Sequence, residues 1–456
     1  MARSGGGARG LSGIRRPSWW QWLILTDTGT AKRTLYNASL PFKQDPAFVD
    51  KFWFDKFQMK ILVNGPLPWK PNPSAIPFEL DKADELAAWQ WLEEQGIPTD
   101  HKLTVYAIAA AAYEHSFHPI IDYLTPLSWS GVPGGIDTWT IKYLGVEDTP
   151  LVRAQSAAWM ISLVARVYAP GCKADHVLVL EGEQGDLRRG KSSALEILGR
   201  PWYTDNIAVL GSREAAEQIV GRWLVELSEL DAMRAKPSQT KSFISRRTDR
   251  FRWVYDPAVR EYPRQCVFAA TVNGQNWNRD PTGARRFWPM WCTFVDVDGL
   301  EAARDALFAE ARDRYLAGEH WWIDDPSLIV EVRQQQELRY LEDPWEEKFL
   351  TELTERVASY RTQLSVKGNI FADTVSMNWA LNILGYPFEK RTVKEQQRVA
   401  QMLQRQGWTR KLVPSNPYIL KSKRIWRYVP PGYEAATRSV NLAVYDACAN
   451  RYETDC

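Results

Sequence analysis

The chain has 456 residues, of which 45% are apolar and 25% charged, and it includes 22 tryptophans. This length predicts two or three domains, and this composition excludes long disordered tracts. The formal net charge of +2 does not by itself identify a nucleic-acid-binding protein, because a balanced total can conceal a local basic surface.

Cysteine usage and hydropathy exclude two further classes of protein. The five cysteines are scattered, and no two of them form a CxxC pair, so neither a disulfide framework nor a zinc site is expected. This pattern suits a reducing cytoplasm. The longest apolar stretch, at 103–113, is far shorter than the roughly 20 residues that span a bilayer, so we expect no membrane insertion.

The N-terminal third predicts an arm followed by a helical domain. Residues 1–18 are glycine-rich with four arginines and no acidic residue, which predicts a flexible arm or a cleaved transit segment. Residues 19–148 mix tryptophan-bearing segments with helical patterns and predict an α-rich domain. In one of these patterns, apolar residues from Leu86 to Leu92 recur at helical spacing, and Gly96 suits the helix end.

The middle of the chain alternates strands with helices. The runs HVLVLEG (176–182), RWLVEL (222–227) and QCVFAATVN (265–273) predict buried strands, separated by helical and basic segments. Such alternation predicts a parallel α/β sheet, whose ligands bind at the carboxyl ends of the strands. We assign this core, with a helical extension beyond Val297, to residues 149–340.

The C-terminal part predicts a separate small domain at 346–430, followed by a tail at 431–456. A helix near 373–384 precedes a second helix that begins at Thr392, and the strands TRKLV and RIWRYV follow. Two helices followed by a basic hairpin predict a winged-helix-like domain.

The strongest motif is a phosphate-binding loop directly after the first core strand. Gly185, Gly190, Lys191 and Ser192 fit the pattern GxxxxGK[ST], and Ser193 follows in the first helical turn. A triphosphate needs converging backbone N–H donors, a lysine that neutralises charge, and a hydroxyl that binds Mg²⁺. The motif therefore predicts ATP and Mg²⁺ as ligands. An ordinary strand-to-helix turn is the structural alternative.

Gly182 leaves the register of this loop open. GEQGD followed by LRR also fits a phosphate loop with a three-residue insertion before GKS, and we therefore include Gly182 among the nucleotide-binding residues. Lys191 and Ser192 keep their roles in either register.

The strand RWLVELSEL ends in two carboxylates, Glu226 and Glu229. A P-loop ATPase needs a carboxylate at the tip of a neighbouring strand, either to hold the water shell of the metal or to deprotonate the attacking water. Glu229 is better placed for this role because it follows the apolar run. Glu226 is either a site residue or a surface-facing position of the strand.

Two further polar features predict catalytic partners. Asn273 ends the strand QCVFAATVN, where it can orient the attacking water or simply form a turn. Arg285 and Arg286 lie in DPTGARRFWP, away from any acidic partner in the sequence, which suits an arginine finger that reaches the nucleotide of a neighbouring subunit. Surface ion pairing is the alternative for both arginines.

Residues 232–264 concentrate positive charge, with nine basic against three acidic side chains. A predicted hairpin in this segment presents Arg252, Tyr255 and Arg260, and Lys241 precedes it. Cations beside an aromatic ring suit the phosphates and bases of single-stranded DNA. A solvated basic loop is the alternative.

These motifs resemble the virulence-associated E family of phage and mobile-element proteins, relatives of the superfamily-3 helicases. The resemblance extends over 22–429 and is tightest in the core. The matching stretches are FHPIIDYL, VARVYAPGCKADHVLVLEGEQG, GRWLVELSEL, CVFAATVN and DPTGARRFWP.

The resemblance implies roles for the residues that match these stretches. It implies an AAA+ or superfamily-3-like P-loop core that forms a hexameric ring, with the basic hairpin lining the pore. Lys191 and Ser192 take the phosphate-loop roles, Glu229 the acidic-strand role, and Asn273 the sensor role. Ser228 stands where many ring ATPases carry a metal-orienting aspartate, so the resemblance leaves metal binding to Ser192 and Glu229.

We therefore expect an ATP-dependent DNA translocase or helicase in the cytoplasm of a bacterium or phage-infected cell. Its expected partners are single-stranded DNA, origin duplex, further copies of the chain, and a separate primase. One alternative is a nucleotide-switched origin-binding protein that uses Lys394, Arg398 and Arg405 of the C-terminal helix. A phosphotransferase for small molecules is the other.

Overall fold

The structure is a computed structural model in which two compact units are distinguished. One unit comprises residues 1–277 with 285–338, and the other comprises 278–284 with 339–456. The residues that the structure describes are 17–183, 190–228, 237–252, 259–275, 277–278, 286–339, 345–355, 374–414 and 424–430. The predicted arm at 1–18 and tail at 431–456 lie almost entirely outside them.

The N-terminal region combines helices with a small sheet, so the expectation of an α-rich domain was incomplete. Its elements are η1 Ser18–Trp22, α1 Leu35–Gln44, β1 Phe52–Asp55, β2 Lys60–Val63, β3 Phe78–Glu79, α2 Lys82–Glu94, α3 His101–Glu114 and β4 Ser116–Phe117. The strands form a sheet in the order β3-β2-β1-β4. Gly96 adopts φ +73° just after α2, as expected of a helix end, but Leu86 is 47% exposed and is not part of the buried face.

The core is built around a five-stranded sheet whose strands are all parallel, in the order β11-β5-β10-β7-β6. The three predicted strands are all present, with two further strands at the ends of the sheet. The strands are β5 Val177–Gly182, β6 Tyr203–Thr204, β7 Leu224–Ser228, β10 Val267–Asn273 and β11 Phe287–Trp291.

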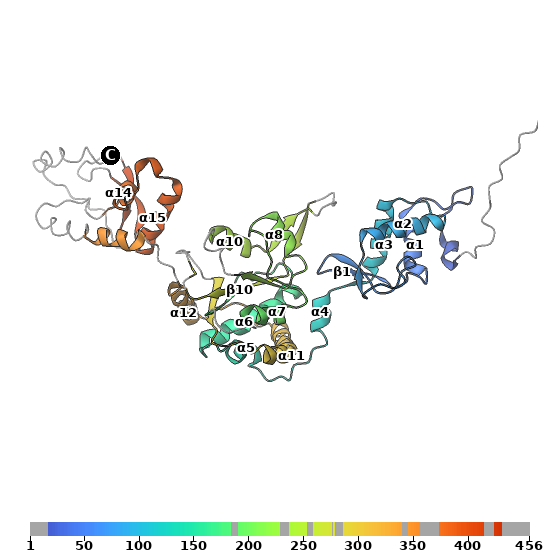
Figure 1. Ribbon diagram of the computed structural model, residues 1–456, viewed down its shortest axis with the longest axis horizontal. Helices are drawn as coiled ribbons and strands as arrows, with labels where there is room; N and C mark the ends of the chain where they lie inside the picture. The colour runs from blue at the N-terminus through green and yellow to red at the C-terminus, as the bar shows by residue number, and fades with distance from the viewer. Residues whose placement is uncertain are drawn as a thin grey trace, which may run out of the picture. The chain divides into compact units, whose positions relative to one another are not determined.

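Helices cover both faces of this sheet. The helices of this region are α4 Pro119–Leu124, α5 Gly135–Leu144, α6 Pro150–Tyr168, α7 Lys191–Gly199, α8 Arg213–Gln218, α10 Pro237–Ile244, α11 Val297–Leu316 and α12 Pro326–Glu337. Figure 1 shows α10 on one side of β10 and α6 and α7 on the other. Every residue of β5 is buried, as is usual for strands of a parallel sheet that is covered on both sides. Leu178 and Leu180 pack with residues of α6 and α7. On the opposite face, Phe268 meets Phe243 of α10 with ring centroids 6.1 Å apart.

The order of the strands creates a switch point at β5. The chain leaves β5 through α7 toward β6 at one end of the sheet, whereas the connection after β10 crosses to β11 on the other side of β5. In open parallel sheets, ligands bind beside such a reversal, at the carboxyl ends of the strands. Gly182 of β5 and Asn273 of β10 are register partners at that edge.

The basic hairpin and the C-terminal unit complete the described structure. β8 Thr248–Phe251 pairs antiparallel with β9 Arg260–Pro263. In the other unit, α14 Met377–Ile383, η4 Phe388–Lys390 and α15 Val393–Arg405 precede a hairpin of β12 Thr409–Pro414 and β13 Arg424–Val429. This is the predicted order of two helices and a hairpin.

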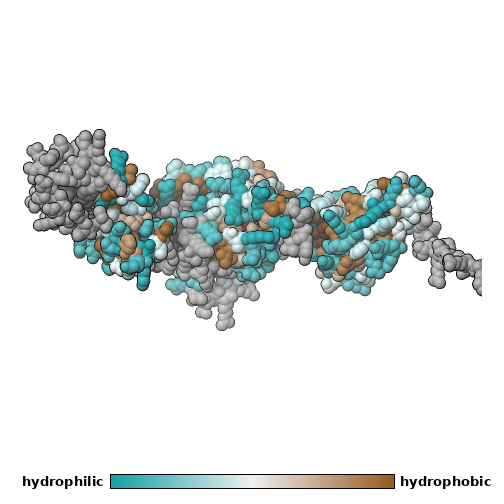
Figure 2. Space-filling model, turned by 90° about the horizontal axis from the view of Figure 1, so that it is seen from above, coloured by the Kyte–Doolittle hydropathy of each residue, from teal (hydrophilic) through white to brown (hydrophobic). Residues whose placement is uncertain are grey.

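The face in Figure 2 is mostly hydrophilic, with hydrophobic residues in separate small patches. No helix among the described residues is long and apolar enough to cross a bilayer.

Candidate nucleotide site

The phosphate-loop lysine lies at the carboxyl edge of the sheet. Gly190 caps α7, and Lys191 is the first residue of that helix. The side chain of Lys191 is largely buried, with Nζ 3.3 Å from the carbonyl oxygen of Gly182 and 3.4 Å from Oδ1 of Asn273. Gly185 lies outside the described residues, so the register of the loop stays open. The N-terminus of α7 and this ammonium group together suit a phosphate anion.

The packing around Lys191 leaves little room for a side chain at Gly182. A Cβ atom at this position would lie 3.1 Å from the carbonyl oxygen of Cys292 and 3.3 Å from Nζ of Lys191. Burial lowers the pKa of Lys191, while Cys292, Glu181 and Glu226 oppose that shift. A triphosphate at this edge would add negative charge beside the ammonium group and so favour its protonated form.

Glu226 is held by three hydroxyl groups from three different elements. Oε1 accepts hydrogen bonds from Ser192 Oγ of α7 at 2.7 Å and from Thr271 Oγ1 of β10 at 2.5 Å. Oε2 accepts from Tyr203 Oη of β6, also at 2.5 Å. The residue is 1% exposed, and these donors satisfy a carboxylate that burial would otherwise penalise.

These contacts decide between the two interpretations of Glu226. The surface-facing alternative is wrong, because this residue is buried and bonded to the phosphate-loop serine. Glu229 lies outside the described residues, and its role stays a prediction. The side chain of Ser228 is likewise not described. Ser192 thus donates to Glu226, and the preference for Glu229 as the catalytic carboxylate stays a prediction.

Sequence reasoning missed Thr271, Tyr203 and a third contact at the same edge. Thr271 lies two residues before Asn273, so strand alternation places both on one face, a signal that was available. Tyr203 belongs to a two-residue strand that carries no comparable pattern. Glu181 Oε1 accepts a hydrogen bond from Trp277 Nε1 at 2.7 Å, and both residues are buried.

Arg286 lies at the opposite edge of the sheet. It directly precedes Phe287, which pairs with Val177 at the start of β5, roughly 17 Å of strand away from Gly182. Its Nε lies 3.2 Å from Asp175 Oδ2 and donates to Ser245 Oγ at 2.8 Å. The sequence near Arg286 offers no acidic partner, but the fold brings Asp175 to it, which agrees with the ion-pairing alternative.

Arg286 therefore does not reach the nucleotide site of its own subunit, and a finger role requires a neighbouring copy. Arg285 lies outside the described residues. Lys241 and Arg286 together line a cavity of about 480 Å³ with Arg246, Ser242 and Ser245.

The basic segment divides into structural and exposed cations. Arg264 is buried and donates to both carboxylate oxygens of Asp249, at 2.5 and 2.9 Å. Arg252 and Arg260 are exposed around the hairpin, whereas Tyr255 lies outside the described residues. Arg264 therefore stabilises the hairpin through its ion pair and does not face solvent.

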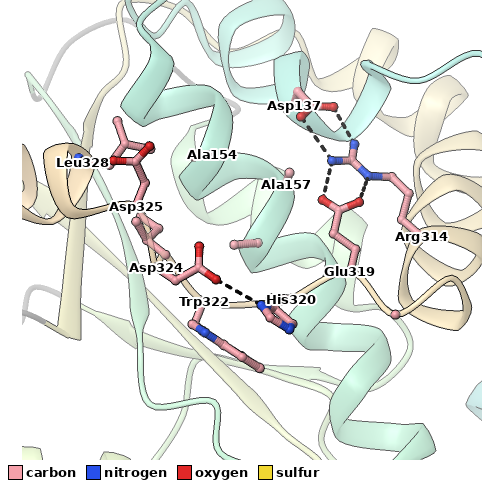
Figure 3. Close-up of a pocket in the computed structure, with 13 residues that line it drawn as sticks. Asp137, Ala154, Ala157, Arg314, Glu319, His320, Trp322, Asp324, Asp325 and Leu328 are labelled. Atoms are coloured by element: carbon pink, nitrogen blue, oxygen red, sulfur yellow. Dashed lines mark hydrogen bonds and ion pairs between the residues drawn. The ribbon is translucent and has the colours of Figure 1, made fainter.

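A second hollow of about 480 Å³ lies among α5, α6, α11 and α12 and contains none of the predicted site residues (Figure 3). Arg314 projects into it between Asp137 and Glu319, while Asp324 pairs with His320 (Figure 3). Asp137 and Glu319 are thus both engaged with Arg314.

The fold and this edge define a class of protein. A buried strand, a lysine at the start of the next helix, and a serine bonded to a carboxylate of a neighbouring parallel strand are the features of a P-loop nucleoside triphosphatase. Residues 124–340 match the model of the virulence-associated protein E-like domain. The chain therefore contains a virulence-associated protein E-like domain, and the family implies a nucleotide hydrolase that uses a nucleoside triphosphate and Mg²⁺.

Two solved structures of the NrS-1 C terminal region, both described as apo, are similar to this chain at low identity. The first is 14% identical with a TM-score of 0.41, and the match covers 84% of this chain and 96% of that chain. The second is 13% identical with a TM-score of 0.42, and the match covers 83% of this chain and 95% of that chain. No curated protein matches the chain.

Proposed function

We propose that this chain is an ATP-dependent DNA translocase, with helicase activity, that acts in replication of a phage or mobile element. The observation that carries the proposal is the convergence of Lys191, Ser192, Glu226 and Asn273 at the carboxyl edge of the switch point. These residues come from three elements that meet where a parallel sheet binds its ligands.

The residues at this edge fit Mg²⁺ and a triphosphate. Ser192 offers a hydroxyl oxygen, a type of ligand that Mg²⁺ prefers, and together with Glu229 it would hold the ion directly or through water, while Glu226 orients the hydroxyl of Ser192. Bound there, Mg²⁺ would neutralise charge on the phosphates. The ammonium group of Lys191 binds phosphate oxygens, and Asn273 orients the attacking water. Glu229 is the proposed general base.

Glu226 suits an orienting role better than a basic one. Three hydroxyl donors occupy most of the lone pairs that a carboxylate offers, so little capacity remains to accept a proton from water. We therefore assign the role of general base to Glu229, and Glu226 orients the hydroxyl of Ser192 through its hydrogen bond.

We further propose that copies of the chain assemble into a hexameric ring. Arg286 lies too far from its own nucleotide site to act there, which supports a role for it, with Arg285, at the site of a neighbouring copy. Single-stranded DNA would contact Lys241, Arg252, Tyr255 and Arg260. The proposal also includes three domains: an α-rich domain at 19–148, the ATPase core at 149–340, and a winged-helix-like domain at 346–430.

The switch-protein alternative has less support than the motor. Arg398 lies over the ring of Trp345 at 3.8 Å, and Arg405 lies 3.3 Å from Glu346, so both cations already have partners within their own unit. The side chain of Lys394 is not described. Binding of DNA that depends on nucleotide without turnover would favour this alternative.

ATPase rates with and without single-stranded DNA test the proposal. We expect DNA to stimulate the wild type and Lys191→Ala to abolish turnover. Lys60→Ala is the control, because Lys60 pairs with Glu79 in the N-terminal region, outside residues 124–340. Equal rates for wild type and Lys191→Ala would exclude the motor. Turnover by a monomer that ignores DNA would favour the phosphotransferase.

A further inference from the structure

Tyr203 connects the end strand of the sheet to the candidate nucleotide site. β6 is two residues long and pairs in parallel with β7, with Tyr203 beside Leu224. The tyrosine side chain extends from there to Oε2 of Glu226, which its hydroxyl meets at 2.5 Å. Tyr203 is only partly buried, so its ring remains near the surface while its hydroxyl lies at the site.

The two carboxylate oxygens of Glu226 accept hydrogen bonds from different donors. Oε1 accepts from Ser192 and Thr271, whereas among the described residues the hydrogen bond to Oε2 comes from Tyr203. A carboxylate that is hydrogen-bonded through both oxygens cannot rotate about its terminal bond without breaking a contact. Tyr203 therefore fixes the plane of the Glu226 carboxylate.

That plane determines how Ser192 presents its hydroxyl. A serine hydroxyl has one hydrogen and two lone pairs, and here its hydrogen is directed at Glu226 Oε1. Both lone pairs are then available to a cation on the other side of the oxygen. If the carboxylate turned, the hydrogen would be free to point elsewhere and the lone pairs would lose their orientation.

The phenol of Tyr203 remains a donor at all physiological pH values. Burial and the neighbouring Glu226 carboxylate raise the pKa of Tyr203 well above its ordinary value. The hydrogen bond from Tyr203 to Glu226 is therefore not lost through deprotonation of the tyrosine.

We propose that Tyr203 is a positioning residue of the nucleotide site, which acts through Glu226 and Ser192 to set the concentration of Mg²⁺ that nucleotide binding requires. This inference rests on the proposed function. It assigns a role to the end strand of the sheet, which no sequence motif indicates.

Nucleotide binding titrated with Mg²⁺ tests this role in the full chain. The probe is a fluorescent, non-hydrolysable ATP analogue. We expect Tyr203→Phe to raise the Mg²⁺ concentration for half-maximal binding about tenfold, the effect of losing one hydrogen bond to a charged group. Binding of the analogue without Mg²⁺ should change less than twofold, because Lys191 and the start of α7 are untouched.

Tyr123→Phe is the matched control. Its hydroxyl also donates to a carboxylate, Asp305 Oδ1, at 2.5 Å, and burial and Asp305 likewise raise its pKa. Tyr123 belongs to α4 and takes no part in the nucleotide site. We expect this variant to keep the Mg²⁺ dependence of the wild type, whatever the two variants do to the melting temperature.

A double-mutant cycle separates positioning from a structural effect. In a Glu226→Gln background, the further change Tyr203→Phe should leave the Mg²⁺ midpoint within twofold, because the tyrosine acts through the carboxylate. The inference would be overturned if the Mg²⁺ midpoint of Tyr203→Phe lay within twofold of the wild-type midpoint. It would also be overturned if Tyr203→Phe raised the Mg²⁺ midpoint by the same factor in the wild type and in Glu226→Gln. Failure of the wild type to bind the analogue at all would instead refute the proposed function.

Discussion

The buried pair of Arg264 and Asp249 is predicted to stabilise the core, although the sequence counts Arg264 only as one of the nine basic residues at 232–264. The two side chains are 1% and 3% exposed, and the guanidinium group also lies 4.3 Å from the ring centroid of Phe243. Removal of Arg264 takes away both hydrogen bonds to the buried carboxylate of Asp249 and leaves it only Arg246, whose Nη1 lies 3.6 Å away; breaking such a buried pair costs about 3–5 kcal/mol. Arg264→Ala should therefore lower the Tm by about 10 °C, at 2–4 °C per kcal/mol for a domain of this size.

Differential scanning calorimetry of the full chain measures this effect. Arg260→Ala is the control, because Arg260 is exposed on the same hairpin, and it should leave the Tm within about 2 °C of wild type. Replacement of both partners, as Arg264→Met with Asp249→Leu, should recover most of the loss, because no unpaired charge remains. A loss below about 1 kcal/mol for Arg264→Ala would refute the reasoning, since an exposed ion pair contributes no more than that.

Three further predictions concern the two edges of the sheet. Gly182→Ala should weaken nucleotide binding about tenfold in a fluorescence titration, because its Cβ would crowd the carbonyl of Cys292 and displace Lys191; unchanged affinity would contradict this. Arg286→Ala should abolish turnover while the affinity for nucleotide changes less than threefold, and normal turnover would remove the finger role. Burial lowers the pKa of His176 from 6.5 to about 3, so the folded protein should lose stability as the pH falls from about 6.5 toward 3. His176→Phe should flatten that dependence in urea unfolding series at several pH values, and an unaltered slope would contradict it.

The sequence by itself determined the features that depend on near neighbours in the chain. Alternation and apolar runs predicted β5, β7 and β10, and the GKS motif placed Lys191 at the start of a helix. The hairpin was also expected, but its first strand, Thr248–Phe251, begins four residues before the predicted strand RWVY, and the sequence did not show which arginines are buried. These patterns succeed because strand burial and phosphate-loop geometry are encoded within a few consecutive residues.

Only the tertiary structure decided which side chains meet at the site. Tyr203, Ser192 and Thr271 lie 23, 34 and 45 residues from Glu226 in the sequence, yet all three donate to its carboxylate. Their meeting depends on the order of the strands, which brings β10 and β7 together and sets β6 beside them. The same order places Arg286 at the opposite edge, because parallel strands gather all their starts on one side of the sheet and all their ends on the other.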